Sequence, residues 1–252
     1  YRQFVQGDAS EVFGAACALG DAVGWPVPDG RMLLVELMAH AAQREFIRDR
    51  LGVPAERIEL TPFMVDTQFF APVPSPDRDR PLICTAGLER RDYATLLRAV
   101  DGLDVDVVIA AASPWSKRSD TTQGENIPAN VSIRRLTLDE LRDVYAASRL
   151  VVMPLDDTDF QAGITTILEG MAMGRPIVCT RTRGQTDTLT EGVTGRYVPP
   201  RDVGALRTAI TALLADPVAS YAMGAAGRGW AVEHADIEVY ARRLASIAGA
   251  VT

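Results

Sequence analysis

From residue 82 onward the chain alternates apolar runs with amphipathic stretches, and this alternation limits the folds it can adopt more than any other feature. The runs are continuously apolar, as expected for parallel strands that are covered on both faces. Each strand is then followed by a helix that crosses back over the sheet in the right-handed sense. The pattern predicts an α/β fold with a Rossmann-like, doubly wound parallel sheet, with strands at about 82–87, 105–112, 131–136, 149–155, 175–180 and 195–200.

Helix signals lie between these runs. Thr137 and Glu140 form a capping box, and the helix that follows is expected to turn four side chains inward, namely Leu138, Leu141, Val144 and Tyr145. Asp202 is the expected cap of a later helix. Near the N-terminus, a stripe of apolar residues predicts another helix from Met32 to Leu51.

Composition and charge exclude several classes of function. The net charge of −7 argues against a surface that binds the phosphate backbone of nucleic acids. No apolar run approaches the roughly 20 residues that span a bilayer, and no signal peptide is recognised, so we expect a cytoplasmic protein. Cys84 and Cys179 lie in strand-like runs and are expected to be buried free thiols. His40 and His234 are isolated, which argues against a metal site.

Ligands of doubly wound sheets bind at the carboxyl ends of the strands. The candidate site therefore comprises the loops after Ala86, Ala112, Pro154 and Thr180. A flavodoxin-like signalling domain is disfavoured, because no aspartate ends the first or third strand in the position for phosphorylation.

The segment from Pro154 to Val178, which ends in FQAGITTILEGMAMGRPIV, carries the richest chemistry. A strand ends at Pro154, an acidic loop follows, and Gly163 opens a helix that begins at about Ile164. The free N–H groups and the positive dipole of a helix start favour an anion or a polar ligand, and the Thr165 and Thr166 hydroxyls add to them. Glu169 is placed to accept two hydrogen bonds from a vicinal diol such as a ribose.

This segment resembles the donor-binding helix of retaining glycosyltransferases with two Rossmann-like domains, the GT-B architecture of the group 1 or GT4-like type. Three further stretches resemble that family in order: LGVPAERIELTPFMVDTQFFAP, SRLVVMPL and GVTGRYVPPRDVGALRTAI. The resemblance covers about residues 36–250. It implies transfer of a hexosyl group from a nucleotide diphosphate sugar to an acceptor hydroxyl, with retention at the anomeric carbon and without a metal cofactor.

The resemblance also assigns roles to residues of the helix segment. The family pattern has two glutamates separated by seven residues; the second corresponds to Glu169, which would bind the ribose of the donor. The first corresponds to Gln161, a departure that leaves sugar binding plausible but supplies no negative charge near a developing oxocarbenium ion. Asp157 and Asp159 are near enough to supply a carboxylate instead, although a solvated acidic loop explains them as well.

A second set of donor contacts is expected in AGLERRDYATLL, residues 86–97. In the family, a glycine ends the first strand of this domain, and an arginine and a lysine then hold the diphosphate. Gly87 and Arg91 correspond to the glycine and the lysine, and Arg90 is the other base of the loop. Guanidinium binds phosphate well, but the first basic position is occupied by Leu88. Two further loops, 113–120 with Trp115, Lys117 and Arg118, and 180–187, are weaker candidates.

By the same resemblance the chain divides into four parts. Residues 1–72 would be a remnant of the N-terminal acceptor-side domain and crossover, 73–81 a linker, 82–232 the nucleotide-sugar-binding domain, and 233–252 a C-terminal helix that packs back toward the N-terminal domain. Because the chain starts at Tyr1 rather than Met, we expect a fragment, with little turnover as it stands.

The expected partners are a UDP- or GDP-linked sugar and an unidentified acceptor, with peripheral membrane association through the N-terminal domain as an open option. One alternative is a non-catalytic or truncated nucleotide-sugar-binding module, which Gln161 favours. A second is a sugar-nucleotide epimerase of the same architecture, which the order of the motifs fits less well.

Overall fold

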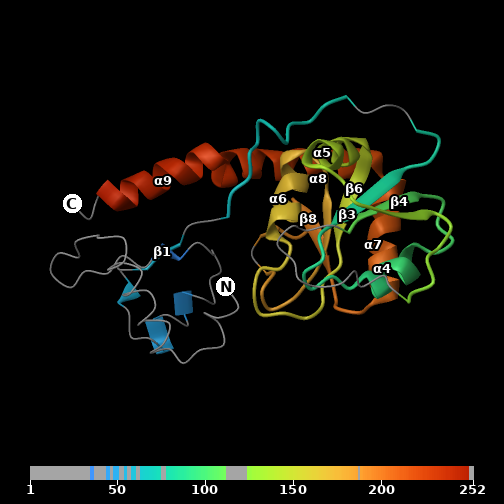
Figure 1. Ribbon diagram of the computed structural model, residues 1–252, viewed down its shortest axis with the longest axis horizontal. Helices are drawn as coiled ribbons and strands as arrows, with labels where there is room; N and C mark the ends of the chain where they lie inside the picture. The colour runs from blue at the N-terminus through green and yellow to red at the C-terminus, as the bar shows by residue number, and fades with distance from the viewer. Residues whose placement is uncertain are drawn as a thin grey trace.

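The computed structural model describes residues 35–36, 44–45, 48–50, 54–55, 58–60, 63–74, 78–111, 124–186 and 188–249 (Figure 1). Its strands are β1 (Val35–Glu36), β2 (Glu59–Leu60), β3 (Leu82–Ala86), β4 (Asp106–Ala110), β5 (Val131–Arg134), β6 (Ser148–Met153), β7 (Ile177–Thr180) and β8 (Gly195–Val198). Its helices are α4 (Tyr93–Val100), α5 (Leu138–Ala147), α6 (Ile164–Ala172), α7 (Val203–Ala215), α8 (Pro217–Trp230), the π-helix η3 (Ala231–Ala235) and α9 (Ile237–Gly249).

Within the described residues, the six strands β3–β8 form one parallel sheet in the order β5-β4-β3-β6-β7-β8. Counted along the chain, this is the order 3-2-1-4-5-6 of a Rossmann-like sheet. The predicted doubly wound sheet is confirmed. The direction of winding reverses between β3 and β6, which lie side by side in the middle of the sheet.

Both faces of the sheet are covered, which explains why its strands are continuously apolar. On one face, α5, α6 and η3 pack on a core that includes Cys84, Val151 and Met153. On the other, α4 and α7 pack on a core that includes Ile83 and Val152 (Figure 1). Helix α8 contacts both α6 and α7 and therefore closes the sheet beside β8. The two cysteines in the strands, Cys84 and Cys179, are buried free thiols as expected.

The predicted capping box before α5 is present, with Thr137 accepting from the Glu140 N–H and Glu140 accepting from the Thr137 N–H. The predicted inward face of α5 is correct for Tyr145, which is fully buried, and wrong for Leu138, which is 56% exposed. Leu138 is the first residue of the helix, at its outer end, where the helix contributes no neighbours from a preceding turn.

The expected helix from Met32 to Leu51 is wrong at its start. Val35 and Glu36 form β1, which pairs in parallel with β2. Pairing between strands uses the backbone groups that an α-helix would need for its own hydrogen bonds. Residues 44–45 and 48–50 are helical, and the apolar stripe proposed for this segment (Leu37, Ala41, Phe46, Ile47 and Leu51) lies outside the described residues.

The stretch before the linker is bound to the sheet domain. The N–H of Val65 donates to the carbonyl of Ala235, and Arg228 donates to the carbonyls of Thr67, Phe70 and Ala172. η3 follows α8 directly, so the domain boundary expected at residue 232 falls inside a continuous stretch of helix. The four-part division of the chain stays a prediction.

Among the described residues no single helix is long and apolar enough to cross a membrane, although α7 together with the segment 217–235 passes that test as a pair bent by 101°.

Candidate functional site

Two loops meet where the sheet reverses its winding direction. The loop after β3 and the loop after β6 leave neighbouring strands at their carboxyl ends. The N–H of Asp92 donates to the carbonyl of Pro154 at 3.1 Å, and the N–H of Asp156 donates to the carbonyl of Arg90 at 3.0 Å. The backbone therefore joins the two predicted donor-binding segments at the switch point, the usual place for a ligand in a doubly wound sheet.

Helix α6 begins at this junction without a side-chain cap. Its N-terminal cap is Gly163, which has φ of +76° and offers no side chain to accept a hydrogen bond from the first turn. Thr165 in that turn is exposed and Ile164 is half-buried, whereas the Thr166 hydroxyl is buried and donates to the carbonyl of Ala86 at 3.5 Å. The start of α6 therefore combines the positive end of a helix dipole with first-turn N–H groups that no side chain caps.

Arg91 lies beneath this junction and is 5% exposed. Its Nε donates to the carbonyl of Ala86 at 2.9 Å, and its Nη1 donates to the carbonyl of Glu89 at 2.6 Å. A methyl group at Gly87 would lie 2.5 Å from the guanidinium, and one at Gly163 would lie 3.1 Å from it. The guanidinium therefore occupies a narrow space between two glycines with positive φ. Burial lowers the pKa of Arg91 from its ordinary value.

Arg90 has an unusual backbone for a residue with a side chain. Its φ is +55°. Among the described residues other than glycine, only Arg201, in the turn before α7, also has a positive φ, at +59°. The carbonyl of Arg90 is the acceptor for Asp156, and its Nε is buried without a hydrogen-bond partner. Strained residues of this kind cluster at ligand sites.

Glu169 projects from α6 one and a half turns after Gly163 and is partly buried. Its Oε2 accepts a hydrogen bond from the hydroxyl of Tyr145 at 2.9 Å. Burial raises the pKa of Glu169 to about 7, while the Tyr145 hydrogen bond and the positive charge of Arg91 act in the opposite direction. Glu169 and Arg91, predicted from separate motifs, are thus close enough for the charge of Arg91 to lower the pKa of the carboxyl group.

Three further predicted residues lie in the loop before α6. Gln161 is half-buried two residues before Gly163, whereas Asp157 and Asp159 are exposed, as expected for a solvated acidic loop. The loop 113–120, with Trp115, Lys117 and Arg118, lies outside the described residues.

The loop after β7 makes contacts that the sequence did not reveal. Gln185 is fully buried; its Nε2 donates to the carbonyl of Ala162, next to the start of α6, and its Oε1 accepts from Thr188. The N–H of Gly184 donates to the carbonyl of Thr158, and a methyl group at Gly184 would lie 2.1 Å from the carbonyl oxygen of Phe160. The sequence signal that could have identified this contact is the pair Gly184–Gln185 in the loop after β7. The two residues hold the loop before α6 in place through their hydrogen bonds to Thr158 and Ala162.

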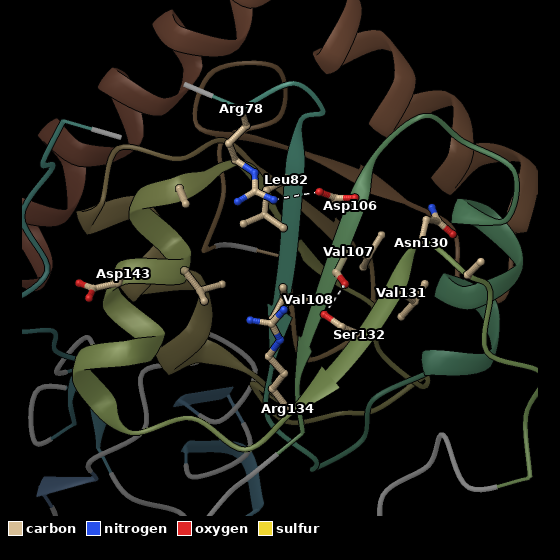
Figure 2. Close-up of a pocket in the computed structure, with 13 residues that line it drawn as sticks. Arg78, Leu82, Asp106, Val107, Val108, Asn130, Val131, Ser132, Arg134 and Asp143 are labelled. Atoms are coloured by element: carbon tan, nitrogen blue, oxygen red, sulfur yellow. Dashed lines mark hydrogen bonds and ion pairs between the residues drawn. The ribbon is translucent and has the colours of Figure 1, made fainter. Parts of the chain in front are cut away.

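A separate groove of about 430 Å³ lies over β4 and β5 beside α5 (Figure 2). The Arg78–Asp106 ion pair of 2.8 Å crosses it, and Asn130, Arg134 and Asp143 also line it. None of the predicted site residues lies in its wall.

This chain is similar in sequence to a known protein family and to a mycobacterial protein. A family model described as glycosyl transferases group 1 matches residues 81–216. The GDP-mannose-dependent alpha-(1-6)-phosphatidylinositol monomannoside mannosyltransferase of Mycolicibacterium smegmatis is 30% identical over 261 residues, covering 90% of this chain and 68% of that protein.

Two solved structures share the fold. Sucrose-phosphate synthase from Thermosynechococcus elongatus superposes with a TM-score of 0.71 at 24% identity, over 85% of this chain and 57% of that one. Anabaena HepE in complex with UDP and glucose superposes with a TM-score of 0.68 at 16% identity, over 84% of this chain and 62% of that one. This chain thus spans less than two thirds of each solved structure and about two thirds of the mycobacterial relative.

Proposed function

This chain belongs to the group 1 glycosyl transferases, and from that membership we propose that it binds a nucleotide diphosphate sugar at the switch point. The bound sugar would serve as donor for the transfer of a hexosyl group to an acceptor hydroxyl, with retention at the anomeric carbon. The observation that carries the proposal is that three groups lie together near the carboxyl ends of β3 and β6. They are the uncapped start of α6, the buried cation of Arg91 and the carboxylate of Glu169.

The start of α6 is the proposed diphosphate site. First-turn N–H groups that no side chain caps can donate to phosphate oxygens, and the helix dipole favours the negative charge. Arg91, directly below, adds a charge that strengthens the positive potential, and Arg90 is the more accessible base of the same loop. Positive groups here would stabilise the leaving diphosphate as the bond to the sugar breaks.

Glu169 is the proposed ribose-binding residue. A carboxylate can accept two hydrogen bonds from the vicinal hydroxyls of a ribose, and such bonds to a charged acceptor are stronger than those between neutral groups. Because burial raises the pKa of Glu169 to about 7, the charged form becomes dominant only above that pH. Donor affinity is therefore expected to increase as the pH rises through about 7.

Gln161 is the proposed contact to the hydroxyls of the transferred sugar, and the exposed Thr165 would flank the phosphates. The Thr166 hydroxyl, also expected there from the sequence, is buried and donates to the Ala86 carbonyl. The relatives guide the choice of donor. The mycobacterial protein is named as GDP-mannose-dependent, and HepE was solved with UDP and glucose, so GDP-mannose is the first donor to test and UDP-glucose the second. Metal independence is part of the proposal.

Calorimetric titration of the chain with GDP-mannose, UDP-glucose, GDP and UDP tests this proposal. We expect one of the two nucleotide classes to bind, and Glu169→Ala to weaken that binding by roughly 1.5–3 kcal/mol. Asp159→Ala is the matched control, because it removes a carboxylate from the exposed loop that leads to the same helix. If Asp159→Ala weakens donor affinity as much as Glu169→Ala or more, the proposal names the wrong carboxylate. If folded protein releases no heat with millimolar ligand, donor binding is refuted.

A second candidate function is that of a nucleotide-sugar-binding module without transferase activity. Gln161 favours it, because a neutral amide brings no negative charge near the reacting carbon. Gln161→Glu separates the two functions. A gain in donor turnover with unchanged nucleotide affinity would support the binding module, whereas turnover by the unmodified chain supports the transferase.

A further inference from the structure

The interior of the site holds a tyrosine whose hydroxyl has no part in the apolar packing around it. Tyr145 lies near the end of α5 and is 0% exposed. Its ring belongs to the core on the α5–α6 face of the sheet and packs edge-on against Phe70, with ring centroids 6.2 Å apart. A phenylalanine would fill this apolar space equally well, so the hydroxyl needs a separate explanation.

The Tyr145 hydroxyl joins α5 to α6. It donates to Oε2 of Glu169 at 2.9 Å. The hydroxyl of Thr166, three residues earlier on the same face of α6, donates instead to the carbonyl of Ala86. The bond to Glu169 therefore links α5 to the helix bearing the proposed ribose-binding carboxylate.

This arrangement leaves one carboxylate oxygen for a ligand. Tyr145 is completely buried, whereas Glu169 is partly exposed, so Oε2 is tied to the interior of the domain. Within the described part of the chain, Oε1 of Glu169 receives no hydrogen bond from the protein. A glutamate side chain has three rotatable bonds, and fixing one oxygen removes most of that freedom before the ligand arrives.

We propose that Tyr145 is a positioning residue for the donor, which holds the Glu169 carboxylate oriented toward the ribose through the hydrogen bond to Oε2. The inference rests on the proposed function of Glu169. Tyr145 itself touches no part of the donor and acts only through Glu169.

The electrostatics agree with this role. The hydrogen bond from Tyr145 lowers the pKa of Glu169 and partly opposes the effect of burial. In turn, burial and the neighbouring charge of Glu169 hold the pKa of Tyr145 well above its ordinary value, so that the phenol stays protonated and remains a donor. Loss of the hydroxyl would therefore both release the carboxylate and favour its neutral form.

The test is Tyr145→Phe in the full chain, titrated with GDP-mannose and UDP-glucose across the pH range 6 to 9. We expect the affinity near pH 7 to fall by roughly 5- to 30-fold, and the pH midpoint of donor binding to move upward because the charged form of Glu169 loses its donor. The loss should shrink at high pH, where Glu169 is ionised in both proteins. A purely structural role would lower affinity equally at all pH values.

Tyr93→Phe is the matched control. Tyr93 is equally buried, and its hydroxyl donates to the carbonyl of Gly87 on the other face of the sheet. Its loss is expected to leave the pH midpoint in place. A double-mutant cycle adds a second readout: if Tyr145 acts through Glu169, then Tyr145→Phe should cost little in a Glu169→Gln background.

The outcomes separate this proposal from the one on which it rests. If the wild-type chain binds donor and Glu169→Ala weakens it, but Tyr145→Phe keeps the affinity and the pH midpoint, then Tyr145 does not position the donor and the proposed function stands. If no donor binds the folded wild-type chain, both fall. If Tyr145→Phe does not fold, 3-fluorotyrosine at position 145 keeps the ring and makes the phenol a stronger donor, which should move the pH midpoint downward, and an unchanged pH midpoint in that variant would overturn the proposal.

Discussion

Helices α4, α5, α7 and α8 each begin with a side chain that closes the first turn, whereas α6 begins at a glycine. Asp92, Thr137, Asp202 and Asp216 accept from an N–H of the helix that each precedes. Gly163 makes no such bond. Each of the four capped helices satisfies one first-turn N–H with its own side chain, whereas no side chain caps the first turn of α6, where we propose that the diphosphate binds.

The glycine has a second function. A methyl group at Gly163 would lie 2.5 Å from Sδ of Met153 and 3.1 Å from the guanidinium of Arg91, both buried. No amino acid with a cap-forming side chain fits there without displacing one of them. The comparison shows that the start of α6 lacks the stabilisation of a side-chain cap, and that the absence of a side chain at Gly163 lets Met153 and Arg91 pack closely against it. Three experiments test it.

Replacing Gly163 with alanine should have the largest effect. The residue would keep a positive φ, which costs about 1–2 kcal/mol, and would force Met153 or Arg91 to move, which costs about 1–3 kcal/mol more. We expect the free energy of unfolding to fall by about 2–5 kcal/mol in urea titration, with donor binding lost as well.

Gly192→Ala is its control, because Gly192 has a similar φ of +74° but no atom within 4 Å of the added methyl group. The variant should lose about 1–2 kcal/mol of unfolding free energy and keep donor binding. Equal losses at the two glycines would mean that the packing against Met153 and Arg91 is unimportant.

Glu169→Gln should stabilise the fold at high pH. The pKa of Glu169 is raised in the folded protein from 4.5 to about 7, so the folded state holds a proton that the unfolded state releases between these values. The contribution of that proton to stability is complete below pH 4.5 and is lost as the pH rises through about 7. Glutamine stays neutral throughout, so at pH 8 we expect the variant to be more stable by about 2 kcal/mol.

Urea titrations of both proteins at pH 5 and pH 8 provide the measurement, and the difference should be small at the lower pH. The same variant should bind donor more weakly, as expected if the site trades stability for function. A variant that is less stable than wild type at pH 8 would contradict the assigned shift.

Asp202→Ala should have the smallest effect. It removes the side-chain acceptor for the Ala205 N–H at the start of α7, far from the switch point in the sheet order. A lost N-cap costs about 1 kcal/mol of unfolding free energy. Donor affinity should not change, and a change would show that the capped helices also serve the site.

The sequence alone was sufficient for the features that depend on neighbours along the chain. Continuous apolar runs predict buried parallel strands, Thr137 and Glu140 predict a capping box, and a glycine before an apolar helix predicts an open N-terminus; the structure contains all three. Each of these follows from backbone geometry within a few residues. The same local rules placed Leu138 in the core and Val35 in a helix, because a local pattern does not show whether another element covers it.

The tertiary structure decided which side chains meet. Tyr145 and Glu169 are 24 residues apart on different helices, and their hydrogen bond exists because α5 and α6 cover the same face of the sheet. Gln185 reaches Ala162 because β6 and β7 are neighbours in the sheet. Residue type and spacing along one element determine which hydrogen bonds a side chain can make. The order of the strands in the sheet determines which partner it makes them with.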